Sequence, residues 1–158
     1  MSLKRFRNKQ NIYIARWVDE THSKRPDEID SELSYAILTD NIQLVEELLN
    51  EGAIASYRFI YAIKRYMDGL YDKDDIIKLL LERGENVNVR DSHDNMKSGL
   101  HIVIEKMYLN NNKGFELLTY LLEKGARMDI RDDDGNTPLH YCAKLRENID
   151  KVMCILNL

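Results

Sequence analysis

The stretch that decides the fold is Asp134-Gly135-Asn136-Thr137-Pro138-Leu139-His140-Tyr141-Cys142-Ala143. A shorter, related string lies earlier in the chain as Ser98-Gly99-Leu100-His101, with Ser98 at the position of Thr137. Self-similarity of this kind indicates a repeat architecture, and overlooking it misassigns the whole fold.

A second recurring pattern is a pair of apolar residues followed by a glycine. It occurs as Val45, Leu48-Leu49 and Gly52, as Ile77, Leu80-Leu81 and Gly84, and as Leu118, Leu121-Leu122 and Gly125. Positions i, i+3 and i+4 lie on one helix face, and glycine accepts the left-handed C-terminal cap without steric cost. Each copy predicts a short helix with a defined end, and Val152 with Ile155-Leu156 begins a fourth copy.

Together these strings resemble the ankyrin repeat, in which a TPLH-type string opens the first of two helices and the paired apolar residues with glycine close the second. The resemblance implies an all-α solenoid of antiparallel helix pairs with short β-hairpin fingers. We expect four helix pairs, over residues 31–52, 56–84, 98–125 and 137–158. The fourth repeat matches the family best, whereas the third carries Gly99 where the family has proline.

The spacing between repeats is irregular. Only about five residues separate Gly52 from the next helix, expected near Tyr57, which is too few for a finger by the family's spacing. Repeats two and three instead carry extra residues between their two helices, around 67–73 and 108–114. Glycine, asparagine and aspartate in these segments favour loops, so we expect two long loops side by side at the edge opposite the fingers.

Residues 1–30 lie outside the four pairs. The apolar residues from Ile12 to Val18 suggest one more helix before a break at Pro26-Asp27, and Asp30-Ser31 with Glu32 suggests a helix cap where repeat one begins. We interpret the extra helix as an amino-terminal cap, with Trp17 packed on repeat one. A tryptophan that anchors a partner is the alternative.

Charge is distributed unevenly. Residues 1–25 contain seven lysines and arginines against Asp19 and Glu20, which leaves residues 26–158 with a net charge of −9 in a chain of net charge −4. The basic leader could touch nucleic acid or an acidic membrane. It lacks interleaved aromatic residues, so a solvated terminus is the favoured reading.

Composition predicts a small cytoplasmic protein. The 158 residues suffice for one domain. No apolar run approaches the roughly 20 residues of a membrane span, and the start of the chain lacks the apolar core of a signal peptide. Cys142 and Cys154 fit small core side chains in a reducing compartment, with a disulfide as the alternative.

No catalytic, cofactor or metal site is expected. The acidic run before Gly135 fails as a calcium loop, because the loop's first and twelfth ligands would fall on Ile130 and Tyr141. His140 and Cys142 point to different helix faces, and no nucleophile-base arrangement is suggested by the spacing. The resemblance implies instead that His140 and His101 hydrogen-bond the backbone of a neighbouring finger.

Contact with partners is implied by the family's geometry, in which the fingers and the first helices line a concave face. The implied contact positions in repeats three and four are Ser92, His93, Asp94, Asn95, Glu105, Lys106, Asp133, Asp134, Asn136, Lys144 and Leu145, and in repeat two Lys64 and Arg65. Singly, each acidic tip is expected to be a solvated turn. Together, the aspartates of the two fingers could form a negative strip that attracts a basic partner: Asp91, Asp94, Asp132, Asp133 and Asp134.

Three functions remain open on the sequence. The first is an intracellular adaptor that binds another protein. For such an adaptor we expect no small-molecule substrate, no membrane partner and no nucleic-acid partner. The second is an inhibitor that neutralises a toxin or a host protein. The third is the regulatory ankyrin part of a larger protein. The isolated chain is expected to be a monomer.

Overall fold

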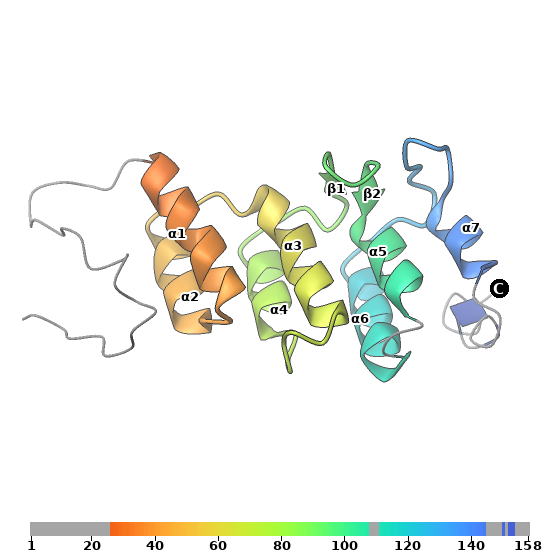
Figure 1. Cartoon of the computed structure of the whole chain (residues 1–158), viewed down its shortest axis with the longest axis horizontal. Helices are drawn as coiled ribbons and strands as arrows, with labels where there is room; N and C mark the ends of the chain where they lie inside the picture. Colours follow the sequence, from red (N-terminus) through yellow and green to blue (C-terminus); the bar gives the residue numbers. More distant parts are fainter. Residues whose placement is uncertain (1–25, 108–110, 145–149, 151, 154–158) are drawn as a thin grey trace, which may run out of the picture.

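The computed structural model describes residues 26–107, 111–144, 150, 152 and 153. Within them the chain forms seven helices and a single two-stranded hairpin. The helices stand in successive pairs along one direction, and the hairpin and the loops that precede the later pairs project from one edge (Figure 1). The predicted all-α solenoid with a β-hairpin finger is therefore confirmed.

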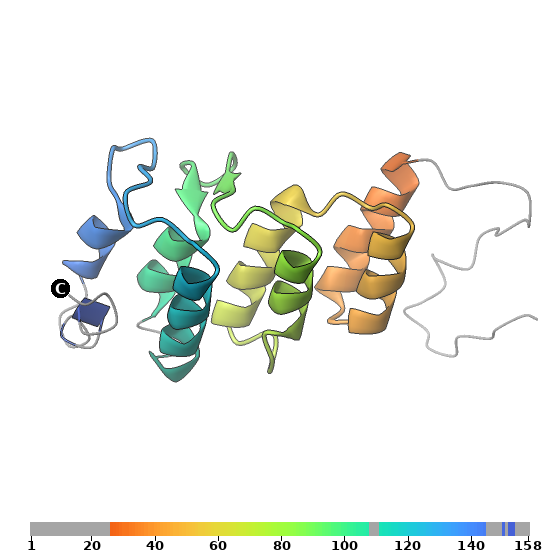
Figure 2. The ribbon, with the colours of Figure 1, turned by 180° about the vertical axis from the view of Figure 1, so that it is seen from behind.

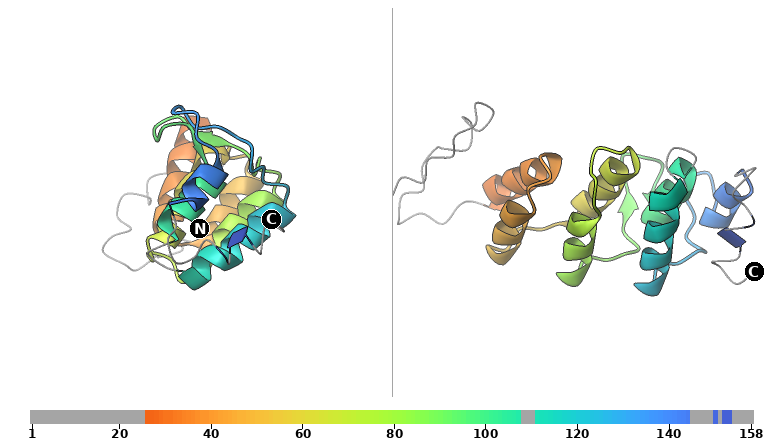
Figure 3. Two further views of the ribbon diagram at one scale, coloured as in Figure 1. Left: turned by 90° about the vertical axis from the view of Figure 1, so that its right-hand side faces the viewer. Right: turned by 90° about the horizontal axis from the view of Figure 1, so that it is seen from below.

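The helices form an inner and an outer row. The inner row contains α1 (Pro26–Leu38), α3 (Ser56–Met67), α5 (Gly99–Lys106) and α7 (Pro138–Cys142). The outer row contains α2 (Ile42–Asn50), α4 (Asp75–Glu82) and α6 (Asn111–Glu123), which face the viewer in Figure 2. Each outer helix packs on the inner helix that precedes it, and each inner helix also contacts the next inner helix (Figure 3).

The outer helices end as the apolar-glycine pattern predicts. Gly52, Gly84 and Gly125 all have positive φ, of 96°, 91° and 86°. After each glycine the next N–H donates to a carbonyl five residues earlier, as Glu85 N–H does to the Leu80 oxygen at 3.1 Å. This is the Schellman arrangement, and a Cβ at these positions would be strained. The apolar residues before the glycines form part of one continuous core.

The first finger is absent. Residues 51–55 connect α2 to α3, and they contain no strand. An arginine joins the two repeats there instead. Arg58 donates through Nη2 to the Asp30 carbonyl at 2.7 Å, through Nε to Ser34 Oγ at 2.9 Å and through Nη1 to the Ile54 carbonyl at 2.6 Å.

Helix α1 begins at Pro26, earlier than the start expected near Asp30. Proline is tolerated in the first turn, where its missing N–H has no partner inside the helix. The Asp30 carboxylate serves another purpose, because it accepts the Ile54 N–H at 3.2 Å from the next repeat. The capping helix predicted around Trp17 lies outside the described residues.

The extra residues between paired helices behave differently in repeats two and three. In repeat two they form the expected loop between α3 and α4, which hangs at the edge away from the fingers (Figure 1). In repeat three the expected loop is wrong for its second half, because α6 already begins at Asn111. Gly114 is buried in that helix, where an added Cβ would lie 2.8 Å from Met107 Cγ. This glycine serves close packing, not a turn.

Gly99, the residue that departs from the family's proline, has a packing role. A Cβ on Gly99 would lie 2.8 Å from Cδ1 of Ile63, a fully buried side chain on α3. We expect Gly99→Ala to lower the free energy of unfolding by about 1–3 kcal/mol through overpacking. Ile63→Val removes the clashing Cδ1, so the double variant should cost less than the two single changes together. Urea denaturation of the four proteins measures this coupling, and strict additivity would contradict the contact.

No helix in the described part of the chain is long and apolar enough to cross a membrane.

Candidate functional site

The finger of repeat three is a short antiparallel hairpin of β1 (Arg90–Asp91) and β2 (Lys97–Ser98). Arg90 pairs with Ser98 and Asp91 with Lys97. The turn uses Asn95 and Met96 at positive φ, 50° and 52°. The Asp91 carboxylate accepts the His93 N–H at 2.9 Å and fixes the start of the turn. The predicted contact residues at the finger tip, from Ser92 to Asn95, thus lie on a defined turn.

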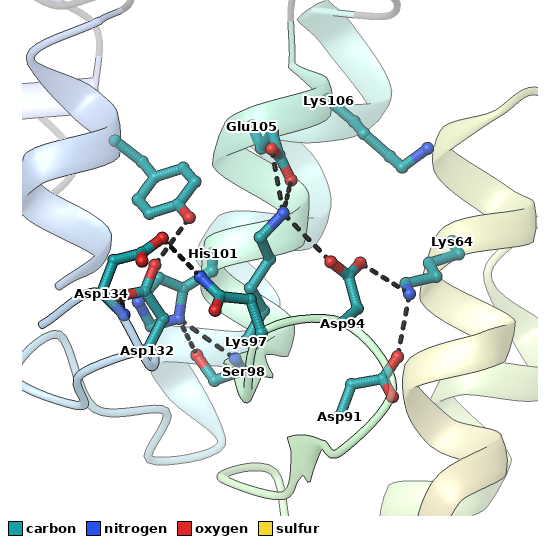
Figure 4. Close-up of polar contacts among 12 residues, drawn as sticks. Lys64, Asp91, Asp94, Lys97, Ser98, His101, Glu105, Lys106, Asp132 and Asp134 are labelled. Atoms are coloured by element: carbon teal, nitrogen blue, oxygen red, sulfur yellow. Dashed lines mark hydrogen bonds and ion pairs between the residues drawn. The ribbon is translucent and has the colours of Figure 1, made fainter. Parts of the chain in front are cut away.

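A chain of ion pairs holds this finger against the inner helices (Figure 4). Lys64 on α3 lies 2.8 Å from Asp91 and 2.7 Å from Asp94. Lys97 lies 3.2 Å from Asp94 and 2.8 Å from Glu105 on α5. The charges therefore alternate in sign from α3 across the finger to α5.

The protonation of this network follows from its geometry. Burial opposes the charge on Lys64, but its bonds to Asp91 and Asp94 outweigh burial and raise the pKa of the ammonium. The bond from Lys64 holds the pKa of Asp94 below its usual value, against a smaller opposing contribution from burial. Lys64 and Asp94 are thus both charged near neutral pH, and their charges are engaged with each other.

The predicted contact positions on the inner helices are mostly engaged inside the molecule. Glu105 binds Lys97, and Lys106 binds Asp68 at the end of α3. Arg65 donates to the Leu38 carbonyl at 3.0 Å. Lys144 is exposed, with its ammonium 4.9 Å from the centre of the Tyr141 ring. Leu145 lies outside the described residues.

The second finger, formed by the loop before α7, shows that the predicted acidic strip is wrong at Asp132. This side chain is only 4% exposed. It accepts the Tyr141 hydroxyl at 2.7 Å and the N–H groups of Asp134 and Asn136 at 3.0 and 2.8 Å. Burial resists its ionisation, but these bonds outweigh burial and lower the pKa of the carboxyl. Asp132 shapes the finger and cannot contact a partner.

The two fingers touch each other through their tips. Asn95 donates from Nδ2 to Asp134 at 2.8 Å, and its carbonyl accepts the Asp133 N–H at 3.0 Å. Asp133 itself is exposed, with Arg90 at 3.9 Å. The groups that still face solvent are therefore Ser92, His93, Asp133 and Asp134.

A buried histidine ties the two repeats together below the fingers. His101 accepts the Ser98 N–H at Nδ1 (3.1 Å), so its neutral ring carries the proton on Nε2, which donates to the Asn136 carbonyl at 3.1 Å. Burial lowers the pKa of His101 and keeps the ring neutral. The expected bond from histidine to a finger is thus present for His101. His140 is exposed and accepts the Thr137 N–H, and no described residue binds its Nε2.

Two residues of the inner helices expose apolar surface and were not among the contact positions predicted from the sequence. Leu38 on α1 and Tyr61 on α3 are 42% and 38% exposed. Their place on the inner helices could have been predicted from the alignment of the repeats. Leu38 lies two positions after Ala36 and Tyr61 one position before Ala62, the two small residues that align the inner helices. They belong to the same row as Lys64 and Arg65.

The described residues contain no group of three or more His, Cys, Asp or Glu side chains placed to hold a metal ion. Cys142 is buried, and burial raises the pKa of its thiol to about 11. A thiol with such a pKa is protonated at neutral pH and is a poor nucleophile. The polar groups described above form hydrogen bonds and ion pairs within the fingers and between neighbouring repeats.

Comparison with known proteins agrees with this architecture. A family model described as ankyrin repeats, in three copies, matches residues 59–157. Ankyrin repeat protein OPG189 of Variola virus is 32% identical over 135 residues, which cover 79% of this chain and 22% of the relative. Protein BB_B28 of Borreliella burgdorferi, also named for ankyrin repeats, is 26% identical over 144 residues, covering 90% of this chain and 31% of the relative.

A third relative, L271 of Acanthamoeba polyphaga mimivirus, is 34% identical over 79 residues, covering 50% of this chain and 10% of the relative. Its name also describes it as an ankyrin repeat protein. This chain therefore spans less than a third of the length of each of these relatives. With the matching family model, the helix pairs and the finger, the chain belongs to the ankyrin-repeat family.

Proposed function

We propose that this protein is a non-catalytic module that binds another protein through its finger tips and the exposed side of its inner helices. Ankyrin repeats generally mediate contacts between proteins. One observation carries the proposal: the two tips are locked to each other and to α3, yet Ser92, His93, Asp133 and Asp134 face solvent. A surface that is rigid before binding loses little conformational freedom when a partner docks.

The partner is proposed to carry a basic surface where it meets the second finger. Asp133 and Asp134 are the exposed carboxylates there, while Asp91 is paired with Lys64 and Asp94 with both Lys64 and Lys97. The attraction is therefore weaker and more local than five free aspartates would give. Its main effect is on the rate of encounter, since exposed charges steer association more than they add affinity.

A second candidate is a regulatory ankyrin segment of a larger protein. It is favoured by the share of the relatives that this chain covers, 22% for the Variola virus protein. Inhibition of a host protein is proposed as a variant of the same binding activity, because relatives occur in viruses. A cytoplasmic location and a monomeric state stay predictions.

The test starts from affinity capture with the intact protein in its native cell and continues with the purified partner. We expect Asp133→Lys with Asp134→Lys to slow association and to weaken its salt dependence, because the tip then repels a basic surface. Glu82→Lys with Glu123→Lys is the matched control, since it makes the same charge change at the ends of the outer helices α4 and α6. Surface plasmon resonance at several salt concentrations measures the rates.

The melting temperatures of both double variants should stay close to that of the parent, because exposed substitutions usually change stability by about 0.5 kcal/mol or less. If the finger variant bound with the same rate and affinity as the parent, the finger tips would be excluded as the contact surface. If the control variant were equally slowed, the effect would come from net charge alone.

A further inference from the structure

The junction between repeats three and four is built around one buried histidine. His101 on α5 is completely buried, and its ring lies beside Ser98 (Figure 4). Its Nδ1 accepts the Ser98 N–H at 3.1 Å and lies 2.8 Å from Ser98 Oγ, while its Nε2 donates to the Asn136 carbonyl at 3.1 Å. The Tyr141 ring of α7 makes a T-shaped contact with the histidine ring, with 5.2 Å between the ring centres. Repeat four thus gives this ring a hydrogen bond and an aromatic contact.

The cover over His101 comes from repeat four. His140 occupies the equivalent position on α7 and forms the same capping box, with Thr137 in place of Ser98. His140 is nevertheless exposed, and no described residue binds its Nε2. The same local sequence therefore gives a buried ring where the next repeat packs on it. The burial of His101 depends on the docking of α7 and the second finger.

A protonated ring does not fit this position. A proton on Nδ1 removes the lone pair that accepts the Ser98 N–H, so this donor loses its acceptor. Burial of the imidazolium also costs free energy, because the charge is taken out of water. The bond from Nε2 to the Asn136 carbonyl survives protonation, so the cost arises at Nδ1 and from burial.

Charged groups face the His101 ring from several elements. Burial has the largest effect and lowers the pKa of His101; the Asn136 carbonyl and Asp132 of the second finger raise it, and Lys97 of β2 and Arg90 of β1 lower it. The net pKa is lowered. The charged side chains of α3 and α6 are paired, hydrogen-bonded within the protein or exposed, among them Lys64 of α3 and Glu116 and Glu123 of α6.

We propose that His101 makes the docking of repeat four on repeat three dependent on pH, because a protonated ring reaches water only when α7 and the second finger move away. The two finger tips are joined where Asn95 binds Asp134 and where its carbonyl accepts the Asp133 N–H, so the same movement separates them. Neutral pH holds the tips together, and mild acid releases the second finger. The inference rests on the proposed function, since it regulates the surface to which the partner binds.

The direction of the dependence follows from linkage. The pKa of His101 is lower in the folded protein than in the unfolded chain, so the docked state binds fewer protons than the open state. Docking is complete above the unfolded value of about 6.5 and weakens as the pH falls toward the folded value. One proton changes the opening equilibrium by at most about tenfold per pH unit.

The test uses the intact protein and amide hydrogen exchange measured by mass spectrometry at about pH 7.5 and about pH 5.5. Each rate is divided by the rate of an unstructured peptide at the same pH. Residues 129–143 report the second finger and α7, and they include the Asp133 N–H that crosses the junction. We expect their protection to fall by several-fold, up to about tenfold, at the lower pH, while protection in α3 changes less.

Two matched variants separate the titrating ring from its structural role. His101→Gln removes the titration but keeps the cap, because glutamine at this position of a helix accepts the N–H of a capping serine. We expect His101→Gln to abolish the excess pH dependence of residues 129–143. His140→Gln makes the same change at the exposed equivalent position and should keep the pH dependence of the parent. Persistence in His101→Gln, loss in both variants, or an equal change in α3 would each overturn the proposal.

A second readout needs no variant, and it decides the matter if His101→Gln does not fold. In the parent, the carbon-bound ring protons of His101 report its protonation by NMR, and the amide signal of Asp133 reports the junction. We expect both signals to change with the same midpoint. A ring that titrates while the Asp133 signal stays unchanged would show that docking is independent of protonation.

These measurements need no partner, so they test the inference separately from the proposed function. If a partner binds through the finger tips but docking does not change with pH, the proposed function stands and this inference fails. If docking depends on pH as expected and the affinity of the partner does not, the pH dependence stands and the finger tips are excluded as the contact surface.

Discussion

Leu100→Ala is expected to lower the free energy of unfolding by about 2–5 kcal/mol, the largest single effect predicted for this chain. Leu100 is 1% exposed on α5, and α5 is packed between α3 and α7. Removing three carbon atoms there leaves a cavity that neither neighbour can fill without moving. Urea denaturation followed by circular dichroism measures the loss.

Leu139→Ala provides the matched control, because Leu139 occupies the same position in the next repeat. The signature string alone suggests a core residue with a similar cost. The structure corrects this, since Leu139 is 38% exposed on α7 and has less contact to lose. We expect a cost of about 1 kcal/mol or less, in the range of partly exposed substitutions. Equal costs for the two leucines would contradict the difference in burial.

Asp132→Ala is expected to cost about 1.5–3 kcal/mol at neutral pH, the range for hydrogen bonds to a charged group. It would leave the N–H groups of Asp134 and Asn136 and the Tyr141 hydroxyl without their shared acceptor. Asp133→Ala changes the neighbouring, exposed aspartate and should cost about 0.5 kcal/mol or less. Thermal and urea unfolding of both variants measure the difference.

The contribution of Asp132 should also depend on pH. Its pKa is lower in the folded protein than the usual value of about 3.9, so the folded state binds fewer protons than the unfolded state. The stabilisation is complete above the unfolded pKa and is lost as the pH falls through the folded pKa. From pH 6 down to about pH 3, the parent should therefore lose more stability than Asp132→Asn does. Parallel pH profiles would show that the carboxylate is not held as described.

Much of the fold follows from short stretches of sequence. Leu80-Leu81 with Gly84, and the two strings like it, predict where each outer helix ends, because these contacts join residues three to five positions apart. The missing finger after Gly52 could be predicted from spacing alone. The role of Gly114 could not be predicted, because it depends on the contact with Met107, which follows the end of α5.

The candidate site was predictable only in its location. The repeat register places Asp94, Glu105, Asp133 and Asp134 on or beside the fingers, but it does not show that Lys64 neutralises Asp94. Nor does it reveal that Leu38 and Tyr61 stay exposed beside Arg65. The pairing of a charged residue and the exposure of an apolar one both depend on which side chain of the neighbouring repeat lies beside it.

The sequence by itself therefore determined the repeat family, the order of the helices and the residues at which the outer helices end, all of which depend on neighbours along the chain. The tertiary structure decided which of two adjacent aspartates, Asp132 or Asp133, is buried, and which of two equivalent leucines, Leu100 or Leu139, is covered. The physical reason is that burial depends on the surface of the neighbouring repeat. Leu100 is buried on α5, which packs between α3 and α7, whereas solvent reaches the equivalent Leu139 on α7.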